Sequence, residues 1–279
     1  MTTVYQEISY AVTDPVARIT MQRPERLNAL TTRMLAEMRH AFAAAEQDER
    51  VVGIVLTGAG RGFCAGMDIA ALDAISAAGR VSREGPPELA ASPGDPALGD
   101  NFAATYSYLL ALRKPVIAAI NGACAGLGFC FALMSDLRFV ERDARFSTAF
   151  SRRGLVAEHG MSWLLPRVIG PSRALDLLWS ARKFDGVEAE RIGLADRLCD
   201  AGTSVETACA YIADLAAHTS PTSLRVIKQQ VYRHLMMPLG PAMVETERLM
   251  NESLERADFR EGVRSFVEQR PPVFPRLKS

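Results

Sequence analysis

The sequence predicts an α/β protein, and three observations support this fold class. Residues 51–57 and 116–120 are runs of small and β-branched side chains, which are typical of strands buried on both faces. Each run ends in a glycine-rich loop that precedes a candidate helix, and residues 172–270 carry apolar side chains at helical spacing. With 279 residues, 48% of them hydrophobic, the chain can form one large domain, or one and a half, with an ample core.

The composition narrows the class of partner. Lys and Arg total 32, as do Asp and Glu, so the chain has no electrostatic footprint for nucleic acid or an anionic membrane. Five cysteines without a CxxC pair favour reduced thiols in a cytoplasm over a disulfide framework or a zinc site. The N-terminal residues show no export or transit signal. We therefore expect a cytoplasmic protein without a metal, whose partners are small molecules or copies of itself.

The first predicted elements are a strand at 16–21 and a helix that begins after Thr31 or Thr32 and reaches about residue 47. The apolar face of this helix carries Met34, Met38, Phe42 and Ala45. Arg26 and Asn28 lie in the loop that precedes it. Their simplest interpretation is a solvated charge and a turn-forming amide in an exposed turn.

The loop after the first buried strand admits a dinucleotide-binding interpretation, because Gly60-x-Gly62-x-x-Ala65 follows a strand. Against it, the next helix opens at Gly66 rather than at residue 60. Residues 73–100 are rich in Ser, Gly, Pro and Ala and lose helical periodicity after about residue 78, which predicts a mobile insertion or lid. Asn101 is then expected to cap a helix through Leu112.

The stretch 113–136 combines a strand, a glycine loop containing Gly126 and Gly128, and an apolar helix. Such a loop leaves backbone N–H groups free to face an anion or a carbonyl oxygen. Residues 115–134 carry no charge, so a transmembrane helix is an alternative, although glycines interrupt it. A dinucleotide fingerprint fails here because the third small residue is missing. Since the strand and glycine loop occur twice, the two loops can bring two N–H donors to one point.

Glu158 stands out in the later part of the chain. It follows two short predicted strands, at 137–140 and 144–148, and apolar residues flank it on both sides. Such surroundings favour the neutral carboxyl group, as a proton-transferring group near neutral pH requires. An exposed glutamate in the first turn of a helix is an equally simple interpretation. The neighbouring His159 has no second ligand at metal-binding spacing, which favours a structural role.

The remaining segments are predicted to be helical, with an extended stretch at 193–199. The predicted helices cover residues 173–180, 187–192, 205–217, 222–235 and 242–270, the last with a break near residue 257. Apolar faces on such helices can pack within the subunit or on a neighbouring copy. We expect residues 1–200 to form the core and residues 201–279 to form a helical oligomerisation region.

Several motifs together resemble the crotonase superfamily, which includes enoyl-CoA hydratases and isomerases. These are Arg23-Pro-Glu-Arg-Leu-Asn-Ala-Leu, Gly62-Phe-Cys-Ala-Gly-Met-Asp-Ile, Lys114-Pro-Val-Ile-Ala-Ala-Ile-Asn-Gly, Ser135-Asp, and Ser220-Pro-Thr-Ser before Lys228. They occur in family order and span nearly the whole chain. The resemblance implies a spiral of repeated ββα units, a helical C-terminal region that packs trimers or hexamers, and a coenzyme A thioester as substrate.

The resemblance also implies site residues. Two backbone N–H groups that bind the thioester oxygen in the family match Met67 and Leu127. The residues expected to contact CoA or the acyl substrate are Arg26, Ala29, Ala65, Gly66, Asp68, Ile69, Gly126 and Phe150. No cofactor is implied beyond the coenzyme A of the substrate.

Two departures from the family pattern bear on the mechanism. The two glutamates of the hydratases are replaced by Cys130 and Phe150, neither of which can exchange a proton as a carboxylate does. The segment around Glu158 is similar instead to a branch of Δ3,Δ2-enoyl-CoA isomerases in which the matching glutamate is the single acid/base. The expected activity is therefore enoyl-CoA isomerisation, with hydration as the alternative and a non-catalytic acyl-CoA-binding relative as a second one. Cys130 is either a small apolar filler or a thiol activated at a helix start.

Overall fold

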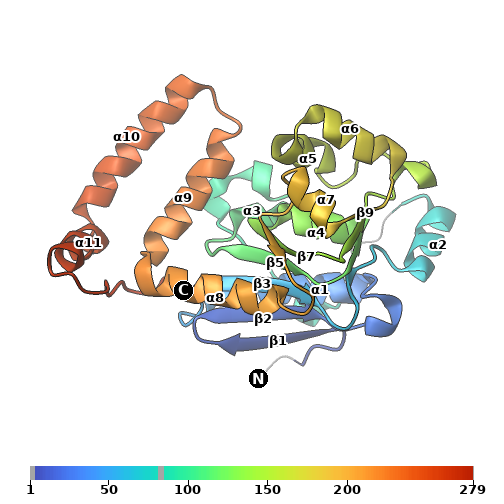
Figure 1. Ribbon diagram of the computed structural model, residues 1–279, viewed down its shortest axis with the longest axis horizontal. Helices are drawn as coiled ribbons and strands as arrows, with labels where there is room; N and C mark the ends of the chain where they lie inside the picture. The colour runs from blue at the N-terminus through green and yellow to red at the C-terminus, as the bar shows by residue number, and fades with distance from the viewer. Residues whose placement is uncertain (1–3, 81–84, 279) are drawn as a thin grey trace.

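Two β-sheets form the centre of the computed structural model, which describes residues 4–80 and 85–278 (Figure 1). The larger sheet has the order β1-β2-β3-β5-β7-β10 and the smaller one the order β4-β6-β8-β9. The larger sheet consists of β1 (Ile8–Thr13), β2 (Val16–Met21), β3 (Gly53–Gly58), β5 (Val116–Ile120), β7 (Leu137–Glu141) and β10 (Arg197–Cys199). The smaller sheet consists of β4 (Gly62–Cys64), β6 (Ala123–Ala125), β8 (Arg145–Ser147) and β9 (Phe184–Asp185).

From β3 to β8, consecutive strands alternate between the two sheets. β3, β5 and β7 run parallel in the larger sheet, and each is followed within a few residues by β4, β6 or β8, which run parallel in the smaller one. The chain therefore repeats a strand–strand–helix unit as a spiral, which confirms the predicted fold class. The predicted strands β2, β3, β5, β7 and β8 are all present, whereas β1 and the three-residue strands β4 and β6 were not predicted.

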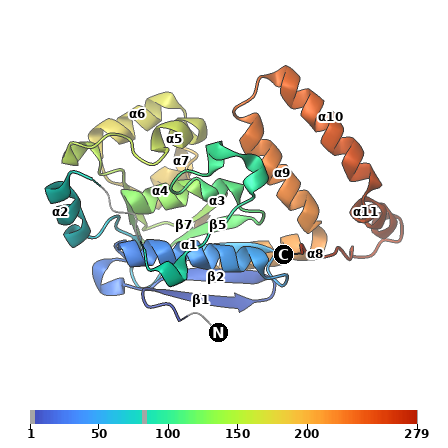
Figure 2. The ribbon, with the colours of Figure 1, turned by 180° about the vertical axis from the view of Figure 1, so that it is seen from behind.

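Helices cover both faces of the larger sheet, as the two opposite views show (Figures 1 and 2). On one face lies α1 (Thr32–Gln47), capped by Thr31, whose Oγ1 accepts a hydrogen bond from Met34 N. The predicted apolar face of α1 is fully buried. On the other face lies α8 (Ser204–His218), whose Ala208 and Ile212 are buried against the sheet. Although α8 lies beyond residue 200, this packing makes it part of the core.

The other α-helices follow the predicted order. They are α2 (Ile69–Ala78), α3 (Tyr108–Ala111), α4 (Leu127–Met134), α5 (Met161–Ile169), α6 (Pro171–Ser180), α7 (Gly186–Arg191), α9 (Pro221–His234), α10 (Leu239–Glu255) and α11 (Ala257–Val267). Short 3-10 turns occur at Pro24–Arg26, Pro87–Leu89, Pro96–Leu98, Asp100–Phe102 and Ser151–Arg153. The uncharged stretch 115–134 is divided between β5, β6 and α4, so it is not one long helix. Within residues 4–80 and 85–278, no helix is both long and apolar enough to cross a bilayer.

The helix predicted for residues 101–112 is wrong, because only Tyr108–Ala111 is α-helical. Long-range contacts shape this segment instead. Asp95 N donates to Ala111 O at 2.9 Å, and the Phe102 side chain is buried in the core. Tertiary contacts of this kind override local helix propensity.

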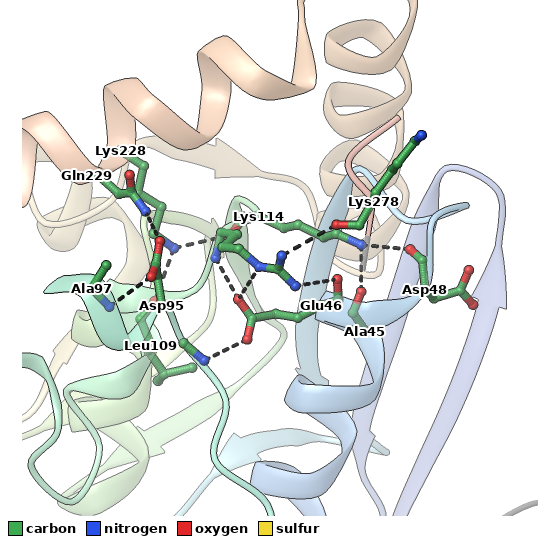
Figure 3. A network of polar contacts seen from close by, with 12 residues as sticks. Ala45, Glu46, Asp48, Asp95, Ala97, Leu109, Lys114, Lys228, Gln229 and Lys278 are labelled. Atoms are coloured by element: carbon green, nitrogen blue, oxygen red, sulfur yellow. Dashed lines mark hydrogen bonds and ion pairs between the residues drawn. The ribbon is translucent and has the colours of Figure 1, made fainter. Parts of the chain in front are cut away.

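Polar contacts anchor the segment that precedes α3 (Figure 3). The carboxylate of Glu46 accepts hydrogen bonds from Gly94 N at 2.6 Å and Arg113 N at 2.7 Å. Gln229 of α9 donates to Asp95 Oδ2 at 2.8 Å. The mobile insertion or lid expected at residues 73–100 stays a prediction. Residues 73–78 of that range belong to α2, and residues 81–84 lie outside the described residues.

The helices α9, α10 and α11 stand to one side of the sheets (Figures 1 and 2). A buried ion pair fixes α9 to the core, with Lys228 Nζ 2.8 Å from Asp136 Oδ2, and Tyr232 OH donates to the other carboxylate oxygen at 2.9 Å. Much of the apolar surface beyond this anchor faces solvent. The side chains concerned are 46% to 84% exposed and include Ile227, Val231, Leu239, Val244, Phe259, Phe266 and Val267.

Candidate active site

The predicted donor Met67 lies on a loop that pairs with the loop before α1. Leu30 forms an isolated parallel β-bridge with Met67: Leu30 N donates to Gly66 O at 2.8 Å, and Leu30 O accepts from Asp68 N at 2.9 Å. Since both neighbours of Met67 are bonded to Leu30, the alternation of an extended backbone directs the Met67 N–H to the opposite side. This amide is therefore available to a ligand on that side.

Asn28 holds the loop before α1 in place. Its side chain is fully buried; Oδ1 accepts from Arg23 N at 2.9 Å, while Nδ2 donates to Ala59 O at 2.9 Å and to Gly62 O at 2.7 Å. Leu27 and Asn28 both have positive φ angles, 50° and 56°. The interpretation of Asn28 as an amide in an exposed turn is thus wrong, because its side chain satisfies buried backbone groups of the β3–β4 connection.

The second predicted donor, Leu127, is the first residue of α4. An N–H at this position has no partner within its own helix, so it points beyond the helix end. The Met67 and Leu127 loops touch, because a Cβ built on Gly66 would lie 3.0 Å from Ala125 O and 3.6 Å from Leu127 N. Gly66, at φ 100°, and Gly126, at φ 51°, adopt backbone conformations that favour glycine. The structure therefore brings the two predicted N–H donors to neighbouring positions.

Glu158 lies in the turn before α5, a helix that packs against α4. Its side chain is 32% exposed, and its Oε2 is 3.8 Å from Nε2 of His159. Burial raises the pKa of Glu158 above the ordinary glutamate value. Since α5 begins only at Met161, Glu158 is not a first-turn residue of that helix, and the alternative of an exposed helix-dipole glutamate does not apply.

Cys130 occupies the same turn of α4 as Leu127. Burial, and secondarily the neighbouring charge of Glu158, raise the pKa of the Cys130 thiol above its ordinary value. The thiol is therefore protonated at neutral pH, which favours the apolar filler over the activated nucleophile. The segment that carries Glu158 also packs against α4, since a Cβ built on Gly160 would lie 2.8 Å from Met134 Cε.

The residues predicted to contact CoA lie on the two paired loops near Met67. Asp68 is the N-cap of α2, and its Oδ2 is 3.0 Å from Nη1 of Arg23. Although burial opposes the shift, the Ala70 N–H and Arg23 hold the pKa of Asp68 below its usual range. The other predicted side chains of these loops, those of Ala29, Ala65, Arg26 and Ile69, are partly or fully exposed.

Phe150 differs from the other predicted substrate contacts. Its side chain is only 5% exposed and belongs to the main hydrophobic core, and its backbone O accepts from Arg153 N and Leu155 N. The ring packs in the interior, and the backbone oxygen closes the turn that follows. We therefore leave Phe150 out of the site proposed below.

Two cavities adjoin this region. The larger, of about 1000 Å³, is lined by α1, α2, residues 103–106 and Met67. The smaller cavity has a volume of about 350 Å³. Its lining includes most of residues 101–107 and also His159, Gly160 and Trp163. The residues common to both walls are Ala104, Thr105 and Tyr106, and the Tyr106 ring lies 5.0 Å from that of His159. Leu127 and Glu158 are not among the described residues that line either cavity.

Comparison with known proteins assigns the chain to a family. The family model for enoyl-CoA hydratase/isomerase matches residues 12–276. The chain belongs to the enoyl-CoA hydratase/isomerase family. The assignment confirms the resemblance to the crotonase superfamily, whereas it leaves the likeness to Δ3,Δ2-isomerases a prediction.

Family members named as hydratases and family members named as isomerases are both similar to this chain. A probable enoyl-CoA hydratase of Rhodobacter capsulatus is 35% identical over 97% of this chain and 98% of that protein. The 1,2-epoxyphenylacetyl-CoA isomerase of Escherichia coli is 35% identical over 93% of this chain and 94% of that protein. In structure, a probable enoyl-CoA hydratase/isomerase of Mycobacterium abscessus superposes with a TM-score of 0.83 at 28% identity, covering 97% of this chain and 99% of the other.

The sequence analysis did not predict the residues that line the two cavities. The second face of α1, with Thr32, Leu35, Ala36 and Arg39, lines the larger cavity. Helical spacing of these residues opposite the buried face was a usable signal, but it does not distinguish a cavity wall from a solvated surface. Tyr106, which lines both cavities, lies in the segment 101–112 that was predicted to be a helix, so its place in a cavity wall did not follow from the expected helical spacing.

Proposed function

We propose that this protein shifts a double bond within an enoyl-CoA thioester, with Glu158 as the single acid and base. The observation that carries the proposal is the arrangement around the first turn of α4. The Met67 and Leu127 amides lie on touching loops at this point, and the charge of Glu158, whose pKa is raised by burial, acts on Cys130 in the same turn. A carboxylate beside two amide donors is the set of groups that enolate chemistry on a thioester needs.

The binding step uses the paired loops. The coenzyme A moiety would contact Arg26, which is exposed at the end of a 3-10 turn, and a partly exposed edge of the paired loops. This edge is formed by Ala29, Ala65, Asp68 and Ile69. Gly66 and Gly126 allow the backbone to approach the thioester closely because they carry no Cβ. The proposed reaction needs no cofactor besides the coenzyme A that the substrate brings.

In the proposed reaction the two amides donate hydrogen bonds to the thioester oxygen. The Glu158 carboxylate removes a proton from the α-carbon of a 3-enoyl group, and the electrons of the C–H bond pass into a dienolate whose negative oxygen the amides hold. Glu158, now protonated, returns the proton to the γ-carbon, which leaves the 2-enoyl thioester. Each such donor typically lowers the barrier by about 3 kcal/mol, so one carboxylate can suffice for this reaction.

The same groups keep enoyl-CoA hydration as a second candidate. Hydration needs a bound water that loses a proton and a group that delivers one to carbon. Two positions match the glutamates of the hydratases. One holds Cys130, whose thiol is protonated, and the other holds Phe150, whose ring is buried in the core. A mechanism with two carboxylates therefore lacks its second acid at these positions. His159, with Nε2 3.8 Å from Oε2 of Glu158, could orient a water beside that carboxylate.

Turnover by purified protein tests the proposal. The enzyme is given a 3-enoyl-CoA and, separately, a 2-enoyl-CoA, and the Glu158→Gln variant is measured beside the wild type. We expect isomerisation of the 3-enoyl-CoA to exceed hydration of the 2-enoyl-CoA, and Glu158→Gln to lower the isomerase kcat by at least about 100-fold. The variant keeps the size of the side chain while it removes the base.

Each other outcome selects another hypothesis. Faster hydration than isomerisation, lost in the same variant, would support the hydratase. Unchanged turnover in Glu158→Gln would remove this residue from the mechanism. Binding of acyl-CoA without turnover of either thioester would indicate a non-catalytic relative.

We also propose that the working protein is a cytoplasmic homotrimer or a hexamer built from two trimers. The exposed apolar side chains of α9, α10 and α11 support the assembly, because monomeric proteins rarely expose so large an apolar surface. The odd number and irregular spacing of the cysteines support the reducing compartment.

A further inference from the structure

The larger cavity borders Met67, one of the two proposed thioester donors, and extends between two helices. The Leu30–Met67 bridge joins the chain just before α1 to the chain just before α2, so both helices start beside Met67. Thr32 at the start of α1 and Ala71 in the first turn of α2 line the cavity, as does Met67. An acyl group whose thioester oxygen is bound by the Met67 amide therefore has this space directly beside it.

The cavity follows each helix for about two turns. On α1 its wall runs from Thr32 to Arg39, and on α2 from Ala71 to Ala78. Seven residues of an α-helix rise by about 10 Å. The acyl group thus has roughly 10 Å of helix wall on either side.

Small side chains give the cavity its width. Nine of the fourteen lining residues that the structure describes carry aliphatic or methionine side chains, and six of these are alanines: Ala36, Ala71, Ala74, Ala78, Ala103 and Ala104. Its volume of about 1000 Å³ is at the upper end of the roughly 300–1,000 Å³ found for small-molecule pockets. Larger side chains at the same positions would occupy much of that space.

Two arginines, Arg39 and Arg80, line this cavity, and the guanidinium group of Arg39 is held in place by the protein. Arg39 Nε donates to Ala91 O at 2.7 Å, and its Cζ lies 4.9 Å from the centre of the Tyr108 ring. These contacts hold the Arg39 side chain against the core and leave the alanine faces as the main apolar wall. A short acyl group would touch only a small part of that wall and gain little binding energy from it.

We propose that the acyl group of the substrate has a bulky apolar body, a ring or a long chain, and that the alanines of α2 set its permitted size. This inference rests on one part of the proposed function, namely that the Met67 N–H donates a hydrogen bond to the thioester oxygen. Filling the space with a larger side chain at Ala71 or Ala74 should then exclude bulky acyl groups and leave short ones unaffected.

Binding of saturated acyl-CoA thioesters tests this without any turnover. Calorimetry gives the Kd of butanoyl-CoA, dodecanoyl-CoA and 3-phenylpropanoyl-CoA for the wild type and for Ala71→Leu and Ala74→Leu. Ala77→Leu is the matched control, because it adds the same side chain to an exposed position of α2 that does not line the cavity. We expect the wild type to bind at least one bulky thioester about 10-fold or more tightly than butanoyl-CoA.

The variants supply the second criterion. Ala71→Leu or Ala74→Leu should weaken binding of the preferred bulky thioester by about 10-fold, with the Kd of butanoyl-CoA changed less than about 2-fold. Ala77→Leu should leave all three values unchanged. A wild type that binds butanoyl-CoA as tightly as the bulky thioesters, or variants that weaken all three equally, would overturn the inference. Either result leaves the proposed isomerisation to be judged by turnover.

Discussion

A carboxyl group that accepts a proton near neutral pH needs surroundings that disfavour its charge, and Glu158 has them. The side chain is two-thirds covered, beside the apolar first turn of α4, and this burial raises its pKa. Complete burial would keep the group neutral at working pH, whereas full exposure would leave it a weak base. The partial exposure of Glu158 suits a group that must give up and regain a proton in each cycle.

The pH dependence of activity follows from the sign of this shift. Only the deprotonated carboxylate can remove the α-proton, so kcat/KM should rise as pH rises through the pKa of Glu158. Because burial raises that pKa, the midpoint of the rising limb should lie above the ordinary value of 4.5. Initial rates on a 3-enoyl-CoA, measured from pH 4.5 to 8 in buffers of constant ionic strength, give the limb. A flat profile over this range, or the same limb in the residual activity of Glu158→Gln, would assign the titration to another group.

At the scale of single elements, the position of α4 decides where the Leu127 amide points. Gly128 makes this position possible, because a Cβ there would lie 2.4 Å from Cys64 O. The helix therefore packs with its backbone directly on β4, and the start of α4 lies against the Gly66 loop. Any side chain at residue 128 must push the helix away from that strand.

We expect Gly128→Ala to destabilise the fold by about 1–3 kcal/mol or more, since the added methyl meets backbone rather than a flexible side chain. Urea denaturation followed by circular dichroism measures the change. The control is Gly240→Ala in α10, where an added Cβ meets nothing within 4 Å and φ is not positive. Alanine is the better helix former there, so this variant should be as stable as the wild type or more stable by up to about 1 kcal/mol. Equal stability of Gly128→Ala and the wild type would contradict the close packing of α4 on β4.

For the whole molecule, the layout separates a packed α/β body from a helical arm. The body is closed on both faces of the larger sheet by α1 and α8, whereas α9, α10 and α11 reach away from it (Figures 1 and 2). The buried pair Lys228–Asp136 fixes the base of the arm, so its apolar side chains are presented in a defined orientation. A rigid arm with an uncovered apolar face is suited to packing against other copies of the chain.

We expect light scattering coupled to size exclusion to give three or six times the chain mass of 30.4 kDa for the wild type. Val244→Glu, at a side chain of α10 that is 71% exposed, should shift the protein toward the monomer because it buries a charge in the interface. Val187→Glu on α7, at a side chain that is 47% exposed and outside the arm, should keep the wild-type mass. A wild type that is monomeric at micromolar concentration would contradict the proposed assembly.

The accuracy of the sequence predictions varied with how much of each element is decided locally. Buried strands such as β3 and β5 were predictable because both faces are covered, which requires a continuous run of apolar residues. The three-residue strands β4 and β6 were not, because so short a run carries no period and exists only through its pairing in the second sheet. The helix expected at 101–112 failed for a related reason, since contacts with Glu46 and α9 shape the chain on either side of it.

The sequence alone was sufficient to establish the family, the spiral of strand–strand–helix units, and the candidate roles of Met67, Leu127 and Glu158, because motifs and apolar periods are local properties. Only the tertiary structure could show that the Met67 and Leu127 loops touch, that Glu158 is partly buried before a helix that packs on α4, and that a large cavity opens between α1 and α2. The physical reason is that closeness in space between residues far apart in the chain depends on how elements pack, and packing is a property of the whole fold.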